Sequence, residues 1–148
     1  MKKWARRAAV GLIGIFLAIQ FVPYGRDHTN PPVLAEPVWD STSTRELAVR
    51  ACFDCHSNET IWPWYSNIAP ISWGLQNDVD AGRDELNFSE WDGSQEGDEA
   101  AESVRDRSMP PAQYLLAHPS ARLSDTELDA LERGLAATFG DHDESDED

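Results

Sequence analysis

Three residues near position 55 have the types and spacing for chemistry. Cys52, Cys55 and His56 form the pattern C-x-x-C-H, and the 148-residue chain contains no other cysteine. Two thiols at this spacing can add to the two vinyl groups of one haem, which places the following histidine beside the iron. The pattern therefore predicts one covalently attached haem c, with His56 as an iron ligand.

Three other interpretations of the two cysteines are weaker. A thioredoxin-like dithiol usually lies near alternating strands and helices, and the sequence shows no strand-like alternation of useful length. A structural zinc ion takes four ligands, whereas Cys52, Cys55 and His56 supply three and no second pair has ligand spacing. A simple disulfide is the remaining alternative.

Met109 is the best candidate for a second axial ligand of the iron. It is the only methionine beyond the N-terminal leader, and Pro110 and Pro111 fix an extended backbone directly after it. His118 is the alternative ligand, and an open or water-filled position is the third interpretation. Three further candidates are set aside because they lie in the leader, a proline-rich segment and an acidic tail, namely Met1, His28 and His142.

Residues 1–24 have the pattern of a membrane anchor or an export signal. Four basic residues precede an apolar run over residues 8–22, and the first acidic residue is Asp27. Because basic residues stay on the cytoplasmic side, we expect the chain after residue 22 to lie on the periplasmic or outer face. Flanking aromatic and basic residues would extend a run that is shorter than a usual membrane span. We therefore predict a single-pass protein of the cytoplasmic membrane, with a cleaved signal segment as the alternative.

The chain is strongly acidic. Its 27 Asp and Glu residues against 12 Lys and Arg residues give a net charge of -15, and no lysine follows Lys3. Residues 8–148 contain eight arginines and all 27 acidic residues, which gives this part a net charge of −19. Such a chain repels phosphate backbones, which argues against nucleic-acid binding. The acidity is typical of solubility at high salt or of steering toward a basic redox partner.

Composition divides the rest of the chain into three parts. Residues 25–42 are rich in proline and predict an extended tether. Residues 43–140 carry helical patterns and predict one all-α haem-binding domain. Residues 141–148 are acidic and predict a disordered tail.

Helix signals within the domain are local and specific. Ser43 with Glu46 and Ser124 with Glu127 match the capping box, which opens a helix. Leucines recur every three or four residues after Ser124 and end at Phe139, as on a buried helix face. Proline and glycine residues indicate where the remaining helices begin and end. Helices are predicted over residues 44–55, 70–86, 98–107 and 124–140.

Aromatic and basic side chains are candidates for the wall of a haem pocket. An indole N–H or a phenol O–H could reach a haem propionate, although ordinary core packing explains the aromatic residues equally well. Arg83 is a candidate partner for a propionate, and a surface arginine is the simpler interpretation. The aromatic candidates are Trp62, Trp64, Tyr65 and Trp73.

Short segments spread over nearly the whole chain resemble a known family. They include CFDCHSNET at 52–60, WPWYS at 62–66, IAPISW at 68–73, MPP at 109–111 and HP at 118–119. In these segments the chain resembles class I c-type cytochromes, and more narrowly the haem-binding-domain family of small single-haem proteins with an N-terminal membrane helix. The acidic stretch at 92–101 and the acidic tail depart from it.

The resemblance implies a cytochrome c-like helical fold around one haem. It also implies that Cys52 and Cys55 attach the haem, that His56 is the proximal ligand and that Met109 is the distal ligand. We expect a membrane-tethered monohaem cytochrome that carries single electrons between respiratory partner proteins, with no substrate chemistry of its own. Two alternatives stay open, a haem-based sensor with a labile distal site and an accessory haem subunit of a larger complex. In the second, Trp39 and Trp91 would lie at contact surfaces.

Overall fold

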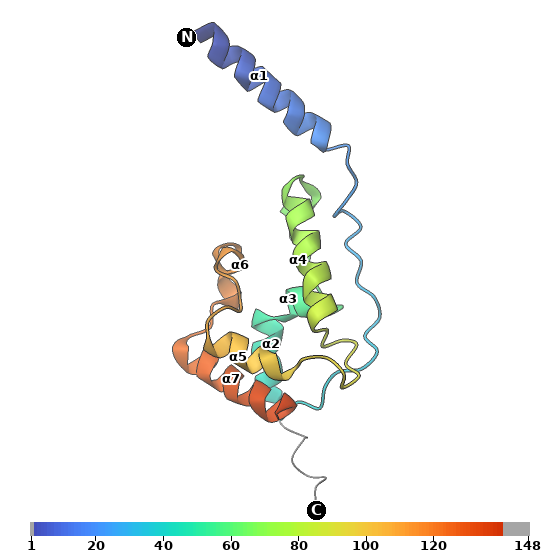
Figure 1. The fold of residues 1–148 in the computed structure, drawn as a ribbon, viewed down its shortest axis with the longest axis vertical. Helices are drawn as coiled ribbons and strands as arrows, with labels where there is room; N and C mark the ends of the chain where they lie inside the picture. The colour runs from blue at the N-terminus through green and yellow to red at the C-terminus, as the bar shows by residue number, and fades with distance from the viewer. Residues whose placement is uncertain (1, 141–148) are drawn as a thin grey trace, which may run out of the picture.

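The computed structural model describes residues 2–140, so Met1 and the predicted acidic tail lie outside the described residues. Its regular elements are all helices, which confirms the predicted all-α class (Figure 1). The one β contact within this range is an isolated bridge between Ala35 and Glu90. The elements are α1 (Lys2–Ile19), α2 (Thr42–Ala51), α3 (Phe53–His56), η1 (Trp64–Asn67), α4 (Ile71–Glu85), α5 (Asp98–Arg105), α6 (Ala112–Ala117), η2 (Pro119–Ala121) and α7 (Asp125–Phe139).

Helix α1 overturns one of the predictions. Four of its 18 residues are Lys or Arg. Its apolar part, residues 8–19, is about 18 Å long at 1.5 Å per residue, against a bilayer hydrocarbon core of about 30 Å. No helix within residues 2–140 is both long enough and apolar enough to cross a membrane. The predicted N-terminal membrane helix, and with it the predicted single-pass location with the domain on the outer face of the cytoplasmic membrane, is therefore wrong.

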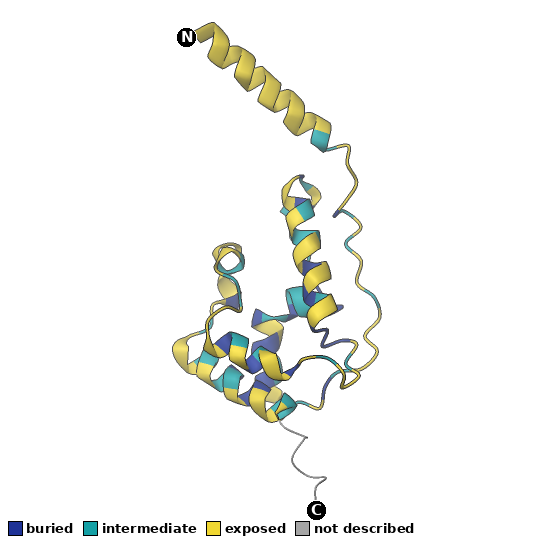
Figure 2. Ribbon diagram, in the orientation of Figure 1, coloured by how far each residue is buried: buried dark blue, intermediate teal, exposed yellow. Residues whose placement is uncertain are grey.

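The core lies at the other end of the molecule, where α2, α5 and α7 pack together (Figure 2). The predicted apolar face of α7 is confirmed, because Leu131 and Leu135 are almost fully buried. Phe53 of α3 and Phe88, which follows α4, are buried in the same cluster. The core therefore extends directly behind the cysteine motif.

Two tryptophans that the accessory-subunit alternative would place at contact surfaces are partly buried and pack against this core. The ring centroid of Trp39 lies 5.2 Å from that of Phe88, and Trp91 lies 4.8 Å from Phe139. Phe139 also stacks on Phe88 at 6.1 Å. Residues from the tether, the loop after α4 and the end of α7 thus converge, which sequence periodicity does not predict.

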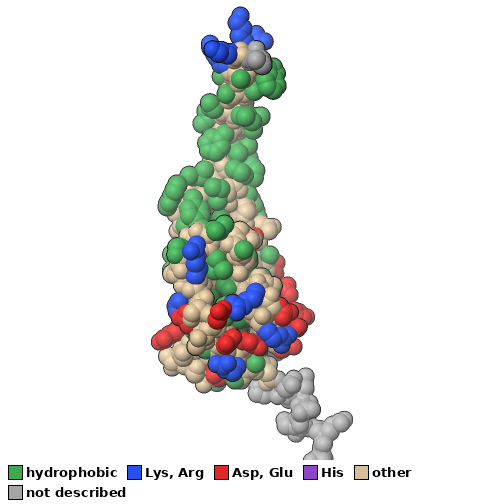
Figure 3. Space-filling model, turned by 90° about the vertical axis from the view of Figure 1, so that its left-hand side faces the viewer, with side chains coloured by type: hydrophobic (Ala, Val, Ile, Leu, Met, Phe, Trp, Pro, Cys, Tyr) green, Lys and Arg blue, Asp and Glu red, His purple; other side chains and the backbone are tan. Residues whose placement is uncertain are grey.

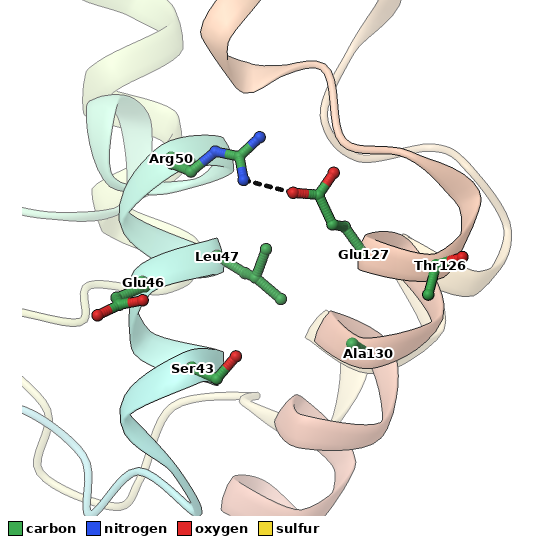
Figure 4. Close-up of a pocket in the computed structure, with 7 residues that line it drawn as sticks. All are labelled: Ser43, Glu46, Leu47, Arg50, Thr126, Glu127 and Ala130. Atoms are coloured by element: carbon green, nitrogen blue, oxygen red, sulfur yellow. Dashed lines mark hydrogen bonds and ion pairs between the residues drawn. The ribbon is translucent and has the colours of Figure 1, made fainter.

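Helices α2 and α7 face each other across a small open pocket (Figure 4). Leu47 points from α2 toward α7, and Arg50 forms an ion pair with Glu127 at 2.6 Å. Solvent reaches both charged side chains and screens their attraction, so the pair adds little to stability. The buried apolar residues, rather than this ion pair, hold the two helices together.

The helix ends agree with the predictions at α7 and differ at α2. The predicted capping box at Ser124 and Glu127 is present, with the Ser124 hydroxyl accepting from the Glu127 N–H. At α2 the residue that caps the helix is Ser41, whose hydroxyl accepts from the Thr44 N–H at 3.1 Å, rather than Ser43. The helix predicted through Cys55 is interrupted at Cys52, which separates α2 from α3.

Arg83 of α4 holds the first part of the predicted tether against the domain. The guanidinium donates to the carbonyl oxygens of Thr29 and Ser57, to the Asn30 side chain and to the Thr60 hydroxyl, at 2.8–3.1 Å. All three of its nitrogens are therefore engaged with the chain. Arg83 does not line the main cavity of the domain, and these bonds to the chain favour a structural role over that of a propionate partner.

Candidate functional site

A cavity of about 720 Å³ lies between the first part of the domain and its last third. Residues of α3 and α4 form one wall, and residues of α6 and the segment before it form the other, with α5 also contributing to the lining. Figure 1 shows α4 and α6 as separate arms of the domain. The volume falls within the range of about 300–1,000 Å³ that ligand cavities occupy. All four residues predicted to form the site line this one cavity, namely Cys52, Cys55, His56 and Met109.

The cysteine motif is held rigidly on its wall. Buried Phe53 anchors it to the core, and the Cys55 N–H donates to the carbonyl oxygen of Cys52 at 3.1 Å. Helix α4 lies so close that a Cβ added to Gly82 would come within 2.6 Å of the Cys55 carbonyl oxygen. Only a glycine permits this approach, so α4 and the motif form one packed unit.

His56 is oriented by a backbone carbonyl. Its Nδ1 lies 3.0 Å from the oxygen of Leu86, and since a carbonyl can only accept, Nδ1 carries the proton. Nε2 is then the nitrogen that can bind a metal, and metal-binding histidines are commonly held in this way. Burial lowers the pKa of His56, with the Leu86 carbonyl acting in the opposite direction, so the ring is kept neutral as a ligand must be.

The two cysteines are free thiols, not a disulfide. Burial raises the pKa of Cys52 to about 12 and that of Cys55 to about 11. Redox-active dithiols have a lowered pKa, and burial acts in the opposite direction here. Among residues 2–140, neither cysteine belongs to a cluster of three or more metal-ligating side chains, so a zinc site does not fit.

A hydrogen bond that the sequence did not predict links the wall formed by α6 to the cysteine motif. Tyr114 of α6 donates from its hydroxyl to Asp54 Oδ2 at 2.7 Å, and Asp54 lies between the two cysteines. The Tyr114 ring also stacks on His118 at 4.1 Å. The only sequence signal for this contact is the position of Asp54 inside the motif.

Both candidates for the distal ligand lie on this second wall. Met109 is 39% exposed, and His118 lies at the end of α6. His28, set aside because it lies in the proline-rich segment, is nevertheless packed, because it stacks on Trp62 at 4.8 Å. It does not line the cavity, so it stays set aside as a ligand.

Two of the four aromatic residues predicted to form the wall of the haem pocket line the cavity. Trp62 and Tyr65 line the cavity as expected. Trp64 is 77% exposed and Trp73 lies outside the lining, so these two do not belong to the wall. The prediction failed for them because a cluster of aromatic residues in sequence does not say which way each ring faces.

A model of the haem-binding domain family matches residues 14–137. The chain belongs to this family. The match covers the motif, both walls of the cavity and the helices behind them. Comparison with curated proteins and with solved structures gives no significant match.

The cavity of this haem-binding domain fits the group that the family name implies. Its lining is mainly apolar, as the face of a porphyrin requires. His56 can offer Nε2 to the iron, because its Nδ1 is hydrogen-bonded to the Leu86 carbonyl oxygen. The prediction of a haem protein with bound iron is therefore confirmed at the level of the family.

Proposed function

We propose that this haem-binding domain is a monohaem c-type cytochrome that carries single electrons between protein redox partners. The observation that carries the proposal is that Cys52, Cys55, His56 and Met109 line one cavity. We infer no substrate chemistry of its own, because the cavity residues invoked here act only by attaching, ligating and enclosing the haem.

The residues take distinct roles in this proposal. Cys52 and Cys55 would attach the haem by two thioether bonds, His56 would bind the iron through Nε2, and Met109 would bind it from the opposite wall. When bound, the iron supplies one-electron chemistry between its ferrous and ferric states. A thioether ligand favours the ferrous state and raises the reduction potential.

The test of covalent attachment is the mass of the denatured holoprotein. We expect one iron porphyrin to remain bound to the chain, and we expect Cys52→Ala and Cys55→Ala to weaken or abolish that retention. A wild-type chain that loses all its haem on denaturation would contradict the c-type assignment.

The test of the electron-carrier role is a redox titration combined with an absorption spectrum. Met109→Ala should keep the covalent haem, lower the reduction potential and remove the sulfur-to-iron charge-transfer band of the oxidised protein. If the wild-type protein has no such band and its reduced form binds carbon monoxide rapidly, the sensor function would be favoured instead. The Met109 side chain is 39% exposed, which supports this alternative.

A further inference from the structure

A histidine on the second wall of the cavity has the hydrogen bonds of a metal ligand. His118 Nδ1 lies 3.0 Å from the carbonyl oxygen of Tyr114, just as His56 Nδ1 lies 3.0 Å from that of Leu86. The carbonyl oxygen only accepts, so Nδ1 is protonated in each ring and Nε2 keeps its lone pair. The cavity is therefore lined by two histidines prepared in the same way.

The His118 ring is held in place relative to the cysteine motif. It stacks on the ring of Tyr114 at 4.1 Å with an interplanar angle of 18°. Tyr114 in turn donates to Asp54, which lies between the two cysteines. Holding a ligand in place before it binds lowers the cost of binding, and this chain of contacts orders His118 beside the site where the haem would be attached.

His118 Nε2 is weakly engaged. Its contact within the described residues is the Tyr65 hydroxyl at 3.4 Å, which is long for an O–H···N hydrogen bond. Such a contact costs little to exchange for a stronger one. Met109 meanwhile is 39% exposed, so solvent reaches the residue proposed as the resident ligand.

We propose that His118 is a reserve distal ligand that binds the haem iron through Nε2 when Met109 leaves it. The inference rests on the proposed function, in which Met109 is the resident ligand. The exchange balances without electron transfer, because the Nε2 lone pair replaces the sulfur lone pair. The Tyr65 hydroxyl keeps its proton and loses only its hydrogen bond to Nε2. Imidazole is a common ligand of iron, so the bond is chemically ordinary.

The test compares variants of the holoprotein by absorption and electron paramagnetic resonance spectra in the oxidised state. Met109→Ala should lose the sulfur-to-iron band yet stay low-spin, with the signature of two nitrogen ligands. Met109→Ala combined with His118→Phe should become high-spin and bind carbon monoxide faster when reduced. Phenylalanine keeps a ring to stack on Tyr114, so this variant removes the nitrogens and preserves the packing.

The matched control combines Met109→Ala with His28→Phe. His28 is also stacked, but its Nε2 lies 3.1 Å from the Ser66 carbonyl oxygen and it does not line the cavity. This control should stay low-spin like Met109→Ala alone. A control that turns high-spin would overturn the proposal, because the low-spin state would then not depend on His118 specifically.

Two further outcomes separate this inference from the proposed function. If Met109→Ala alone is high-spin while the wild type shows the sulfur band, His118 is not a reserve ligand and the Met109 assignment stands. If the wild type has no sulfur band and His118→Phe alone abolishes its low-spin state, His118 is the resident ligand. In that case both the reserve role and the Met109 assignment fail. The spectra report these ligands whether or not the haem is covalently attached.

Discussion

At the scale of single residues, the hydrogen bond from Tyr114 to Asp54 decides how the two walls of the cavity are joined. The acceptor is a carboxylate at 2.7 Å, and hydrogen bonds to charged acceptors are stronger than neutral ones. Burial, with Asp54 as the second cause, raises the pKa of Tyr114 well above its ordinary value. The phenol therefore keeps the proton that it donates at every pH near neutrality.

Tyr114→Phe should lower the free energy of unfolding by about 1.5 kcal/mol, because a partly buried bond to a charged group is lost. Urea unfolding of the variant beside the wild type measures this. The matched control is Tyr24→Phe, since the Tyr24 side chain is exposed and no hydrogen bond from its hydroxyl is formed within residues 2–140. The control should change stability by less than about 0.5 kcal/mol. Equal effects of the two variants would show that the bond to Asp54 contributes nothing.

At the scale of elements, the contact between α4 and the cysteine motif is tight. Two glycines of the same helix differ sharply in their surroundings. A Cβ at Gly82 would lie 2.6 Å from the Cys55 carbonyl oxygen, which is backbone and cannot turn away. A Cβ at Gly74 would have no neighbour within 4 Å. Substitutions at these two positions therefore distinguish the effect of close packing on stability from the effect of helix propensity.

Gly82→Ala should lower the free energy of unfolding by about 1–2 kcal/mol, because overpacking outweighs the gain in helix propensity. It should also reduce the yield of haem attachment, since α4 would be displaced from Cys55. Gly74→Ala should instead raise stability by up to about 1 kcal/mol. Thermal unfolding and the haem-to-protein ratio of the purified variants measure both effects. If Gly82→Ala were as stabilising as Gly74→Ala, the close packing of α4 on the motif would be refuted.

At the scale of the whole molecule, apolar and acidic surfaces are separated. On the face shown in Figure 3, apolar side chains gather along α1 and acidic ones gather on the broader end. Carboxylate oxygens of Glu85, Glu96 and Glu99 lie within 4.8 Å of one another, and all three residues line the cavity. Glu96 is the first cause that raises the pKa of Glu99, followed by desolvation and then Asp98. Repulsion between these like charges therefore destabilises the folded state at this end.

Glu99→Gln should raise the midpoint of thermal unfolding at low salt and neutral pH, because it removes one of the repelling charges. The difference from the wild type should shrink in ~1 M salt, where the Debye length is about 3 Å. The folded-state pKa of Glu99 lies above its ordinary value of 4.5, so its destabilising effect is fully present above the folded pKa. As the pH falls through that value and below 4.5, the wild type should become as stable as the variant. A midpoint difference that is independent of salt and pH would contradict this explanation.

Local spacing accounts for what could be predicted from the sequence. The C-x-x-C-H motif, the capping box at Ser124 and the apolar face of α7 each depend on residues a few positions apart. Helix geometry converts such spacing directly into a shared face or a shared cap. The cysteine motif and the helices at 71–85, 98–105 and 125–139 were therefore predictable, with errors confined to the helix ends. The capping residue of α2 was misplaced by two positions because Ser41 and Ser43 both precede acceptable helix starts.

Only the tertiary structure decided which distant residues meet. The Leu86 carbonyl orients His56, Tyr114 reaches Asp54 across 60 residues, and Arg83 binds the tether instead of facing the cavity. No short pattern encodes these pairings, because each depends on how separate helices pack and on the cavity left between them. Packing also brings Trp39 and Trp91 against the core. The length of α1 corrected the expected membrane helix, since a helix must bring enough apolar residues to cover the hydrocarbon core.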